Sequence, residues 1–101
     1  MEKRRPHFPL QAVIRCASLH DAVRFTRVAF DGAAELMMTQ DDMLAVVRNL
    51  KPSEFYKSMT TYGDHTIWQD VYHPRFQGIP LYLKLTLVEA DNLLVISFKR
   101  R

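Results

Sequence analysis

Glycine, cysteine and long apolar runs are scarce in this 101-residue chain, and each scarcity excludes a class of protein. Three glycines leave no glycine-rich loop that could wrap a phosphate group, which excludes the usual nucleotide-binding loops. A single cysteine, Cys16, excludes an internal disulfide and favours a reducing compartment. No stretch approaches the roughly 20 apolar residues of a membrane span, and the basic MEKRRPHFP start precedes no apolar segment. We therefore expect a cytoplasmic protein with no membrane partner and no cofactor.

The charge that is present is mildly basic and unevenly spread. Lysine and arginine number 14 against 11 acidic residues, which gives a net charge of +3. Half of the basic residues lie in the second half of the chain, and the last three positions are all basic. This balance suits a polyanion such as nucleic acid, although many small domains with other partners are equally basic. With 48% hydrophobic residues, the chain is long enough for one domain with its own core.

The first clear periodic spacing of apolar residues follows the basic N-terminal stretch. Residues 1–8 have no periodic apolar pattern, and we expect them to form a flexible basic arm. Apolar residues then recur at helical spacing behind a proline, so residues 9–18 are predicted to form an amphipathic helix. Cys16 and His20 lie four residues apart, but two ligands do not make a metal site, and no metal is expected. Val23–Phe25 is predicted to be a short extended segment.

Two further helices are predicted before the pattern changes. Thr26 offers an N-cap for a helix that runs to about Leu36. Gly32 lies inside this helix and costs about 1 kcal/mol relative to alanine. Thr39 caps the third helix with a capping-box spacing, and this helix ends before Pro52.

From Phe55 onward the apolar period changes from 3.6 to 2, which predicts strands. The candidate strands cover residues 55–62, 66–72, 80–89 and 93–100. Gly63-Asp64 is a turn signal between the first two, and residues 76–80 are expected to be a loop. Helices followed by an antiparallel meander predict a single α+β domain over residues 1–101. The helices should cover one face of the sheet and leave the other face free.

The last two strands allow a register to be predicted. In the string LYLKLTLV, leucines alternate with polar residues, so one face is apolar and the other polar. A two-residue turn at Asp91-Asn92 would pair Lys84 with Lys99 and Tyr82 with Arg101. The same register puts three apolar side chains on the core face: Leu94, Ile96 and Phe98. We therefore predict that Tyr82, Lys84, Lys99 and Arg101 line one phosphate-binding face, away from the helices.

The stretch 53–72 concentrates aromatic and polar side chains in one predicted hairpin. It reads SEFYKSMTTYGDHTIWQDVY and holds three of the four tyrosines and the single tryptophan. Its strings FYKSMTTY and DHTIWQDVY, together with LYLKLTLV and LLVISFK, resemble the motility quorum-sensing regulator family of bacterial mRNA interferase toxins. The resemblance continues more thinly through the MEKR start, the Val23-Arg24 and Thr26-Arg27 region and residues 43–50, so it covers nearly the whole chain.

The resemblance implies a RelE-like fold and metal-independent cleavage of single-stranded mRNA at GCU-like sites. It also implies growth arrest that is relieved by a cognate antitoxin with zinc-binding and DNA-binding parts. Three positions match the family's proposed catalytic residues, and all three are intact: Lys57, Gln69 and Tyr82. The family usually has an arginine where His73 stands and a serine-like residue at Gly63. These departures leave the reaction alone and affect substrate contacts and sequence preference.

RNA carries its own nucleophile, because the 2′-hydroxyl can attack the adjacent phosphorus and leave a 2′,3′-cyclic phosphate and a 5′-hydroxyl. An enzyme must align that hydroxyl, stabilise charge on the phosphate oxygens and handle two protons. Lys57 can supply the charge, Gln69 can supply neutral hydrogen bonds, and Tyr82 can act in proton transfer. Protonation state is the difficulty, because free tyrosine and lysine side chains both titrate near pH ~10. Unless neighbouring cations lower both values, alignment and charge stabilisation carry most of the rate.

Further RNA contacts are expected from seven side chains: Tyr56, Met59, His73, Arg75, Lys84, Lys99 and Arg101. The aromatic side chains of this half can either stack on bases or pack in the core: Tyr56, Tyr62, Trp68, Tyr72 and Phe76. We expect Trp68 to be mostly packed and one or two tyrosines to be exposed. From the residues alone two other functions stay open, because a basic sheet serves them equally. These are a non-catalytic RNA- or DNA-binding module and a protein-interaction domain.

Overall fold

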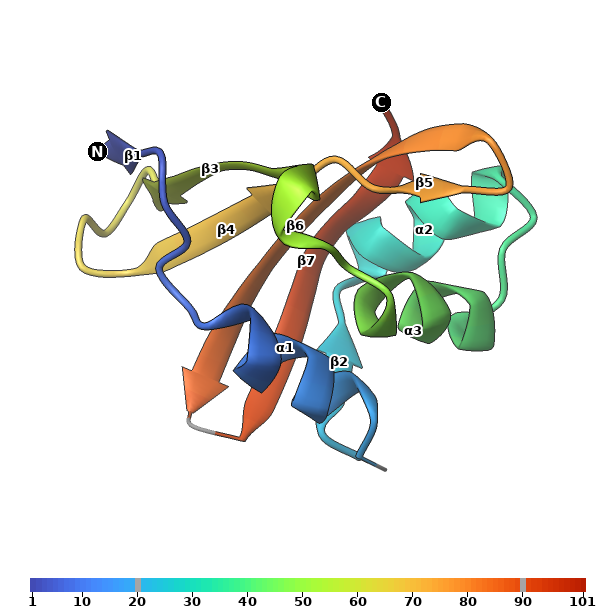
Figure 1. Ribbon diagram of the computed structural model, residues 1–101, viewed down its shortest axis with the longest axis horizontal. Coiled ribbons are helices and arrows are strands. Elements are labelled where there is room, and N and C mark those ends of the chain that lie inside the picture. Colours follow the sequence, from blue (N-terminus) through green and yellow to red (C-terminus); the bar gives the residue numbers. More distant parts are fainter. Residues whose placement is uncertain (20, 90) are drawn as a thin grey trace.

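The computed structural model describes residues 1–19, 21–89 and 91–101, so His20 lies outside the described residues. In these residues the chain forms three helices and a seven-stranded sheet, which confirms the α+β class (Figure 1). The helices are α1 (Leu10–Ala17), α2 (Arg27–Glu35) and α3 (Gln40–Arg48), followed by the 3₁₀ turn η1 (Pro52–Glu54). The strands are β1 (Glu2–Lys3), β2 (Val23–Phe25), β3 (Phe55–Thr60), β4 (Trp68–Tyr72), β5 (Arg75–Phe76), β6 (Ile79–Glu89) and β7 (Asn92–Arg100). None of the described helices is long and apolar enough to cross a bilayer.

The sheet runs in the order β1-β3-β4-β6-β7-β2, with β5 paired to β6 outside this path. The four predicted strands are antiparallel neighbours, as expected. The sheet is nevertheless mixed, because β2 pairs in parallel with β7 at the far edge. The stretch predicted as a loop is a tight hairpin between β5 and β6. Its corner residues Gln77 and Gly78 have φ values of 49° and 82°, which suits a two-residue hairpin turn.

The helices begin where their caps predict. The Thr26 hydroxyl accepts a hydrogen bond from the Ala29 N–H at 3.0 Å, and Thr39 and Asp42 form the expected capping box. α1 and α3 lie on one face of the sheet (Figure 1). Their buried apolar side chains belong to the core. On the sheet side this core contains the predicted apolar face of β6, with three leucines fully buried: Leu81, Leu83 and Leu85.

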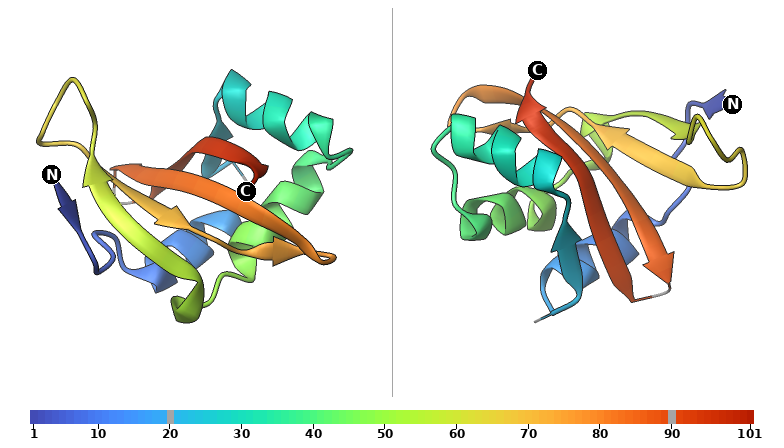
Figure 2. Two further views of the ribbon diagram at one scale, coloured as in Figure 1. Left: turned by 90° about the horizontal axis from the view of Figure 1, so that it is seen from above. Right: turned by 180° about the vertical axis from the view of Figure 1, so that it is seen from behind.

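α2 runs along the outer edge of β7, as the view from behind shows (Figure 2). Gly32 lies at this contact. A Cβ at this position would overlap the carbonyl oxygen of Phe98 and stand 3.1 Å from its carbonyl carbon. The same edge is joined to the start of the helix, where the Thr26 hydroxyl donates to the Ile96 carbonyl at 2.7 Å. The glycine that weakens the helix locally is therefore required by the close approach of helix and strand backbones.

The predicted register of the last hairpin is wrong by two residues. The structure pairs Tyr82 with Lys99 and Lys84 with Ser97, whereas the sequence placed Lys99 opposite Lys84 and Arg101 opposite Tyr82. Asn92, expected in the turn, already pairs with Glu89 as a strand residue. Because side chains alternate with a period of two, a shift of two residues leaves the residues of this end of the hairpin on their predicted faces. Tyr82, Lys84 and Lys99 therefore still share the polar face.

A bulge changes the core face of β7. Lys84 pairs with Ser97 but the next residue, Leu85, pairs with Val95, so Ile96 is left outside the ladder. Val95 is consequently fully buried, whereas Ile96 is only half-buried. Leu94, also predicted to face the core, is half-buried as well, and Phe98 is buried as expected. An extra unpaired residue of this kind leaves no mark in the alternation of apolar and polar residues.

Residues 1–8, expected to form a flexible arm, lie against the sheet in the structure, and we call them the N-terminal strap. Its first residues form β1, which pairs antiparallel with β3. Further along, the backbone N–H groups of His7 and Phe8 each donate to a carboxylate oxygen of Asp70 at 3.0 Å. Asp70 is fully buried, and the His7 ring stacks on Trp68 with centroids 5.2 Å apart. The strap is thus fixed to the β3–β4 hairpin at both ends.

Candidate active site

The face of the sheet turned away from the core carries the predicted site residues. Three cross-strand rows make up this open face: Glu2–Met59–Gln69, then Lys57–Val71–Lys84–Ser97, then Tyr82–Lys99. Neighbouring rows on one face lie two residues apart along the strands, or about 7 Å, so the three rows span about 14 Å and lie within reach of one short segment of RNA. Val71 is fully buried although it faces away from the core.

Lys57 is held by the N-terminal strap. Its Nζ donates to the Glu2 carboxylate at 2.9 Å, and the side chains are 21% and 54% exposed respectively. Hydrogen bonding to Glu2 raises the pKa of Lys57, and hydrogen bonding to Lys57 lowers the pKa of Glu2. Both groups are therefore charged at neutral pH. The Lys57 ammonium also stands 5.5 Å from the centre of the Tyr56 ring.

His73 follows β4 and joins two tyrosines of the neighbouring strands. Its ring stacks on Tyr56 with centroids 4.3 Å apart and lies tilted against Tyr82 at 6.0 Å. Arg101 donates to the imidazole Nδ1 at 2.9 Å, and since arginine can only donate, a neutral ring carries its proton on Nε2. Burial, and then the charge of Arg101, lowers the pKa of His73. The ring is therefore neutral at pH 7 and its Nδ1 lone pair is occupied.

Cations gather on the third row and beside it. The Lys99 ammonium stands 5.1 Å from the centre of the Tyr82 ring, its cross-strand partner. Burial, and then the charge of Lys99, lowers the pKa of Lys84 on the neighbouring row. Like charges held this close are favoured by an anion between them, which suits a phosphate group.

Arg75 is not brought to the open face. Its guanidinium donates to the Gly78 carbonyl at 3.2 Å within the β5–β6 hairpin. It borders a groove that is also lined by Ala45 and Val46 of α3. Arg75 therefore lies on the helical side of the domain, unlike the other side chains expected to contact RNA.

The aromatic residues divide as the sequence predicted. Tyr56 is 42% exposed and Tyr62 is fully exposed, whereas Trp68 is half-buried beneath His7 and Lys3. Tyr72 is buried in the core, where burial and then Asp70 raise its pKa to about 12. Only Tyr56, among these, contacts the cationic side chains of the open face.

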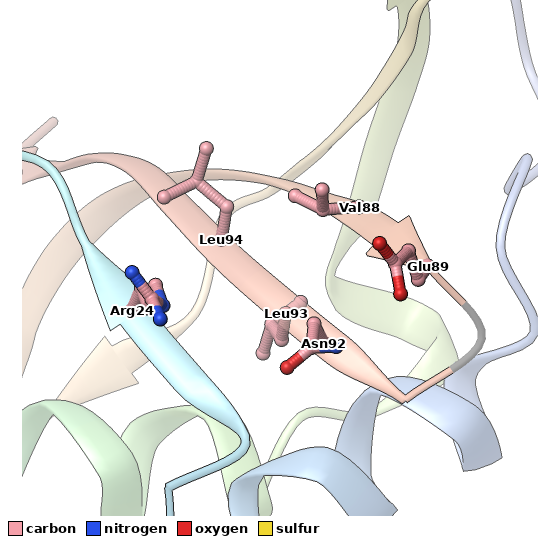
Figure 3. Close-up of a pocket in the computed structure, with 6 residues that line it drawn as sticks. All are labelled: Arg24, Val88, Glu89, Asn92, Leu93 and Leu94. Atoms are coloured by element: carbon pink, nitrogen blue, oxygen red, sulfur yellow. The ribbon is translucent and has the colours of Figure 1, made fainter.

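A separate hollow of about 300 Å³ lies at the other end of the β6–β7 hairpin (Figure 3). Arg24 on β2 and Glu89 on β6 are its charged side chains, and Asn92 together with apolar residues of β6 and β7 forms the rest of its wall. Six residues of strand separate Tyr82 from Val88, which amounts to about 20 Å. This hollow is therefore no part of the open-face site. In the described ranges, no three side chains of His, Cys, Asp or Glu are grouped as a metal ion would require.

Glu2 is the member of the open face that the sequence did not predict. It reaches Lys57 across 55 residues of chain, from a strand of only two residues. A segment this short shows no period, so neither apolar alternation nor turn residues could have indicated its pairing. The single hint was the weak resemblance of the MEKR start.

Two comparisons with known proteins accord with this geometry. The family described as "Motility quorum-sensing regulator, toxin of MqsA" matches residues 5–100. A protein of Escherichia coli (strain K12), named mRNA interferase toxin MqsR, is 48% identical over 101 residues, which is the full length of both chains. The family match spans every strand of the open face except β1. The chain therefore belongs to the motility quorum-sensing regulator toxin family.

Proposed function

We propose that this protein is an endoribonuclease toxin of the cytoplasm that cleaves single-stranded mRNA at short specific sequences. The observation that carries the proposal is the joint placement of Lys57, Gln69 and Tyr82 on one cation-rich sheet face. That face belongs to a chain 48% identical to a protein named as an mRNA interferase toxin. The resemblance further suggests GCU-like cleavage sites.

Lys57 and Gln69 act on the phosphate in this proposal. The Lys57 ammonium has three donors, of which one is used by Glu2, so the others can bind non-bridging oxygens of the scissile phosphate. Its raised pKa keeps this charge in place while negative charge builds up on those oxygens. Gln69 lies two residues along from the partner of Lys57, on the same face, and its amide can orient the phosphate or a base.

Tyr82 acts as the general acid and donates a proton to the leaving group. As the P–O5′ bond breaks, the phenol O–H donates to O5′, which becomes the 5′-hydroxyl. The Lys99 ammonium 5.1 Å from the ring centre stabilises the phenolate that results. The neutral His73 ring, 6.0 Å away, adds no positive charge of its own at pH 7.

RNA contacts beyond the scissile phosphate come from the rest of the open face. Lys84, Lys99 and Arg101 can bind neighbouring phosphates, while Tyr56 and Met59 can pack against bases. Phosphate contacts contribute affinity, and the base contacts contribute sequence preference. Where the family usually has an arginine, His73 offers a neutral ring, so we expect a base preference that differs from other members at one position.

The partner that restrains this activity is proposed to be an antitoxin protein with a zinc-binding part and a DNA-binding part. The family description names its members as the toxin of MqsA, which supports a dedicated partner. Mixing the purified antitoxin with this chain should suppress RNA cleavage at equimolar concentration.

End-labelled single-stranded RNA tests the reaction directly. In saturating EDTA the wild-type protein should produce fragments with 2′,3′-cyclic phosphate ends. Lys57→Ala, Gln69→Ala and Tyr82→Phe should each slow cleavage by about 100-fold or more. Their thermal midpoints should stay close to wild type, because substitutions on an open sheet face cost little stability. Arg15→Ala on α1 is the matched control and should cleave normally.

Three results would count against the proposal. Cleavage that EDTA abolishes and Mg²⁺ restores contradicts metal independence. Retention of RNA without cleavage points to a nucleic-acid-binding module. Neither retention nor cleavage points to a protein-interaction domain.

A further inference from the structure

Transesterification of RNA requires a proton acceptor as well as a proton donor, and most side chains of the open face cannot accept. Lys57 keeps its proton because its pKa is raised by Glu2. The Nδ1 lone pair of His73 is occupied by Arg101. Gln69 is a neutral amide, and Tyr82 already serves as the donor in the proposed reaction. The proposed site residues thus provide no acceptor for the proton of the 2′-hydroxyl.

Glu2 supplies the missing type of group at the right place. β1 fixes its backbone opposite Met59, so Glu2 lies in the same cross-strand row as Gln69. The Lys57 contact at 2.9 Å shows that its carboxylate points along the open face toward the phosphate-binding side chains. Only one of its two oxygens is used in that contact, and its side chain is 54% exposed. A free carboxylate oxygen can therefore meet a substrate hydroxyl beside Lys57.

Other acidic side chains accept hydrogen bonds away from the open face. Asp70 is buried on the core side and accepts from His7 and Phe8. Asp64 accepts from Thr66 within the β3–β4 turn. Among the described residues, Glu2 is the carboxylate that forms an ion pair with a cation of the open face, Lys57. A second ion pair lies on α2.

We propose that Glu2 is a further catalytic residue, the general base that removes the proton from the attacking 2′-hydroxyl. The inference rests on the proposed RNA cleavage. The 2′-O–H proton moves to the Glu2 carboxylate as the 2′-oxygen bonds to phosphorus. The P–O5′ bond breaks, and O5′ takes its proton from Tyr82. Both residues return to their starting states by proton exchange with water, and the products are a 2′,3′-cyclic phosphate and a 5′-hydroxyl.

The surrounding charges fix the pH range in which this base works. Lys57 of β3 hydrogen-bonds to Glu2 directly, and the charges of Arg4 and of the Met1 α-amino group, which flank β1, act on Glu2 as well. All of them lower the pKa of Glu2 below its ordinary value of 4.5. The base form is therefore present throughout the neutral range and is lost only as the pH falls below that value. A carboxylate of low pKa is a weak base, so its contribution belongs at the lower end of the range for general bases, about 100-fold.

The pH dependence of single-turnover cleavage tests the role of Glu2. Wild type should be flat between about pH 5 and pH 8, because Glu2 is already ionised. Glu2→Gln keeps an oxygen that can accept from Lys57 but cannot take a proton. It should cleave about 100-fold more slowly at pH 6, with KM little changed. Its rate should rise about tenfold per pH unit, as hydroxide replaces the missing base. Glu2→Asp should recover part of the rate, and Glu35→Gln on α2 is the control that removes the same charge elsewhere.

A second substrate separates loss of a base from loss of structure. When sulfur replaces the scissile O5′, the leaving thiolate needs no proton, because thiols are more acidic than alcohols. The defect of Tyr82→Phe should then shrink, whereas the defect of Glu2→Gln should persist. Amide hydrogen exchange in β1 and the thermal midpoint report whether the strap is still docked.

The outcomes divide clearly. If wild type cleaves and Glu2→Gln cleaves as fast at pH 6, Glu2 is no base and the inference fails while the proposed function stands. Faster cleavage by Glu2→Gln would mean that the Glu2 carboxylate competes with the phosphate for Lys57. That result would also overturn the inference. A slower Glu2→Gln with a flat pH profile, or with a defect that the sulfur substrate relieves, assigns it another role. Absence of cleavage by wild type overturns both proposals.

Discussion

Asp70→Ala is the substitution that most directly tests how the N-terminal strap is held. Asp70 is fully buried, and its two carboxylate oxygens accept the N–H groups of His7 and Phe8 at 3.0 Å each. Alanine removes both acceptors and leaves no side chain that could replace them. The strap residues lie near the surface, so in the variant their N–H groups can turn to water once the strap lifts away.

The size of the effect follows from these contacts. Hydrogen bonds to charged groups contribute about 1.5–3 kcal/mol each, which gives an upper limit near 6 kcal/mol for two. Rehydration of the released N–H groups, and relief of the cost of burying a carboxylate, should return about half of this. We expect the free energy of unfolding to fall by about 3 kcal/mol. For a domain of this size, at about 4–8 °C per kcal/mol, the thermal midpoint should drop by about 12–24 °C.

Thermal and urea unfolding measure this difference, with Asp31→Ala as the matched control. Asp31 is 65% exposed and pairs only with Arg27 on α2, so its loss should cost less than about 0.5 kcal/mol. Hydrogen exchange at the His7 and Phe8 amides should accelerate in Asp70→Ala before the sheet unfolds. Cleavage of RNA should fall in parallel, because the strap carries Glu2. An unfolding free energy lowered by no more than the Asp31 control would refute this account of the strap.

Two other predictions concern the α2 edge and the basic face. Gly32→Ala should lower the free energy of unfolding by about 1–2 kcal/mol, since overlap with the Phe98 carbonyl outweighs the gain of about 1 kcal/mol in helix propensity. Ala34→Gly on the exposed side of the same helix gives the comparison, and a Gly32→Ala protein more stable than wild type in urea would contradict the packing argument. Lys99→Glu should weaken RNA binding and cleavage far more than Arg15→Glu on α1, as measured by filter retention and gel assay at two salt concentrations. Equal losses in the two variants would mean that net charge, rather than the open face, governs RNA binding.

Local signals predicted the elements because the causes of those elements are local. The Thr26 and Thr39 caps mark the starts of α2 and α3, and alternating leucines mark the core face of β6. The shared face of Tyr82 and Lys99 followed from the same alternation, and it survived a register error of two residues because parity was preserved. The likeness to the RelE fold, in contrast, stays a prediction.

Features that depend on contacts between distant residues could not be predicted. The bulge at Ile96 is set by packing of β7 against β6 and the helices, and β2 joins the sheet in parallel after a connection that the sequence does not distinguish from a loop. The pairing of β1 with β3 fixes the position of Glu2. It depends on the hydrogen bond between Asp70 and the N–H group of His7, which lies five residues after Glu2. Arg75 was assigned to the RNA-binding set from its charge alone, and the tight hairpin directs it elsewhere.

The way in which the outer edge of β7 is covered has a consequence for solubility at high concentration. β2 pairs with the first half of the outer edge of β7, and α2 lies against the second half with Gly32 in contact with the Phe98 carbonyl. An unprotected edge of this length could template strands of other copies and begin a cross-β aggregate. Here the helix backbone blocks that growth sterically, with no charged or proline residue needed on the strand. Loosening α2 should therefore reveal itself first as self-association through β7.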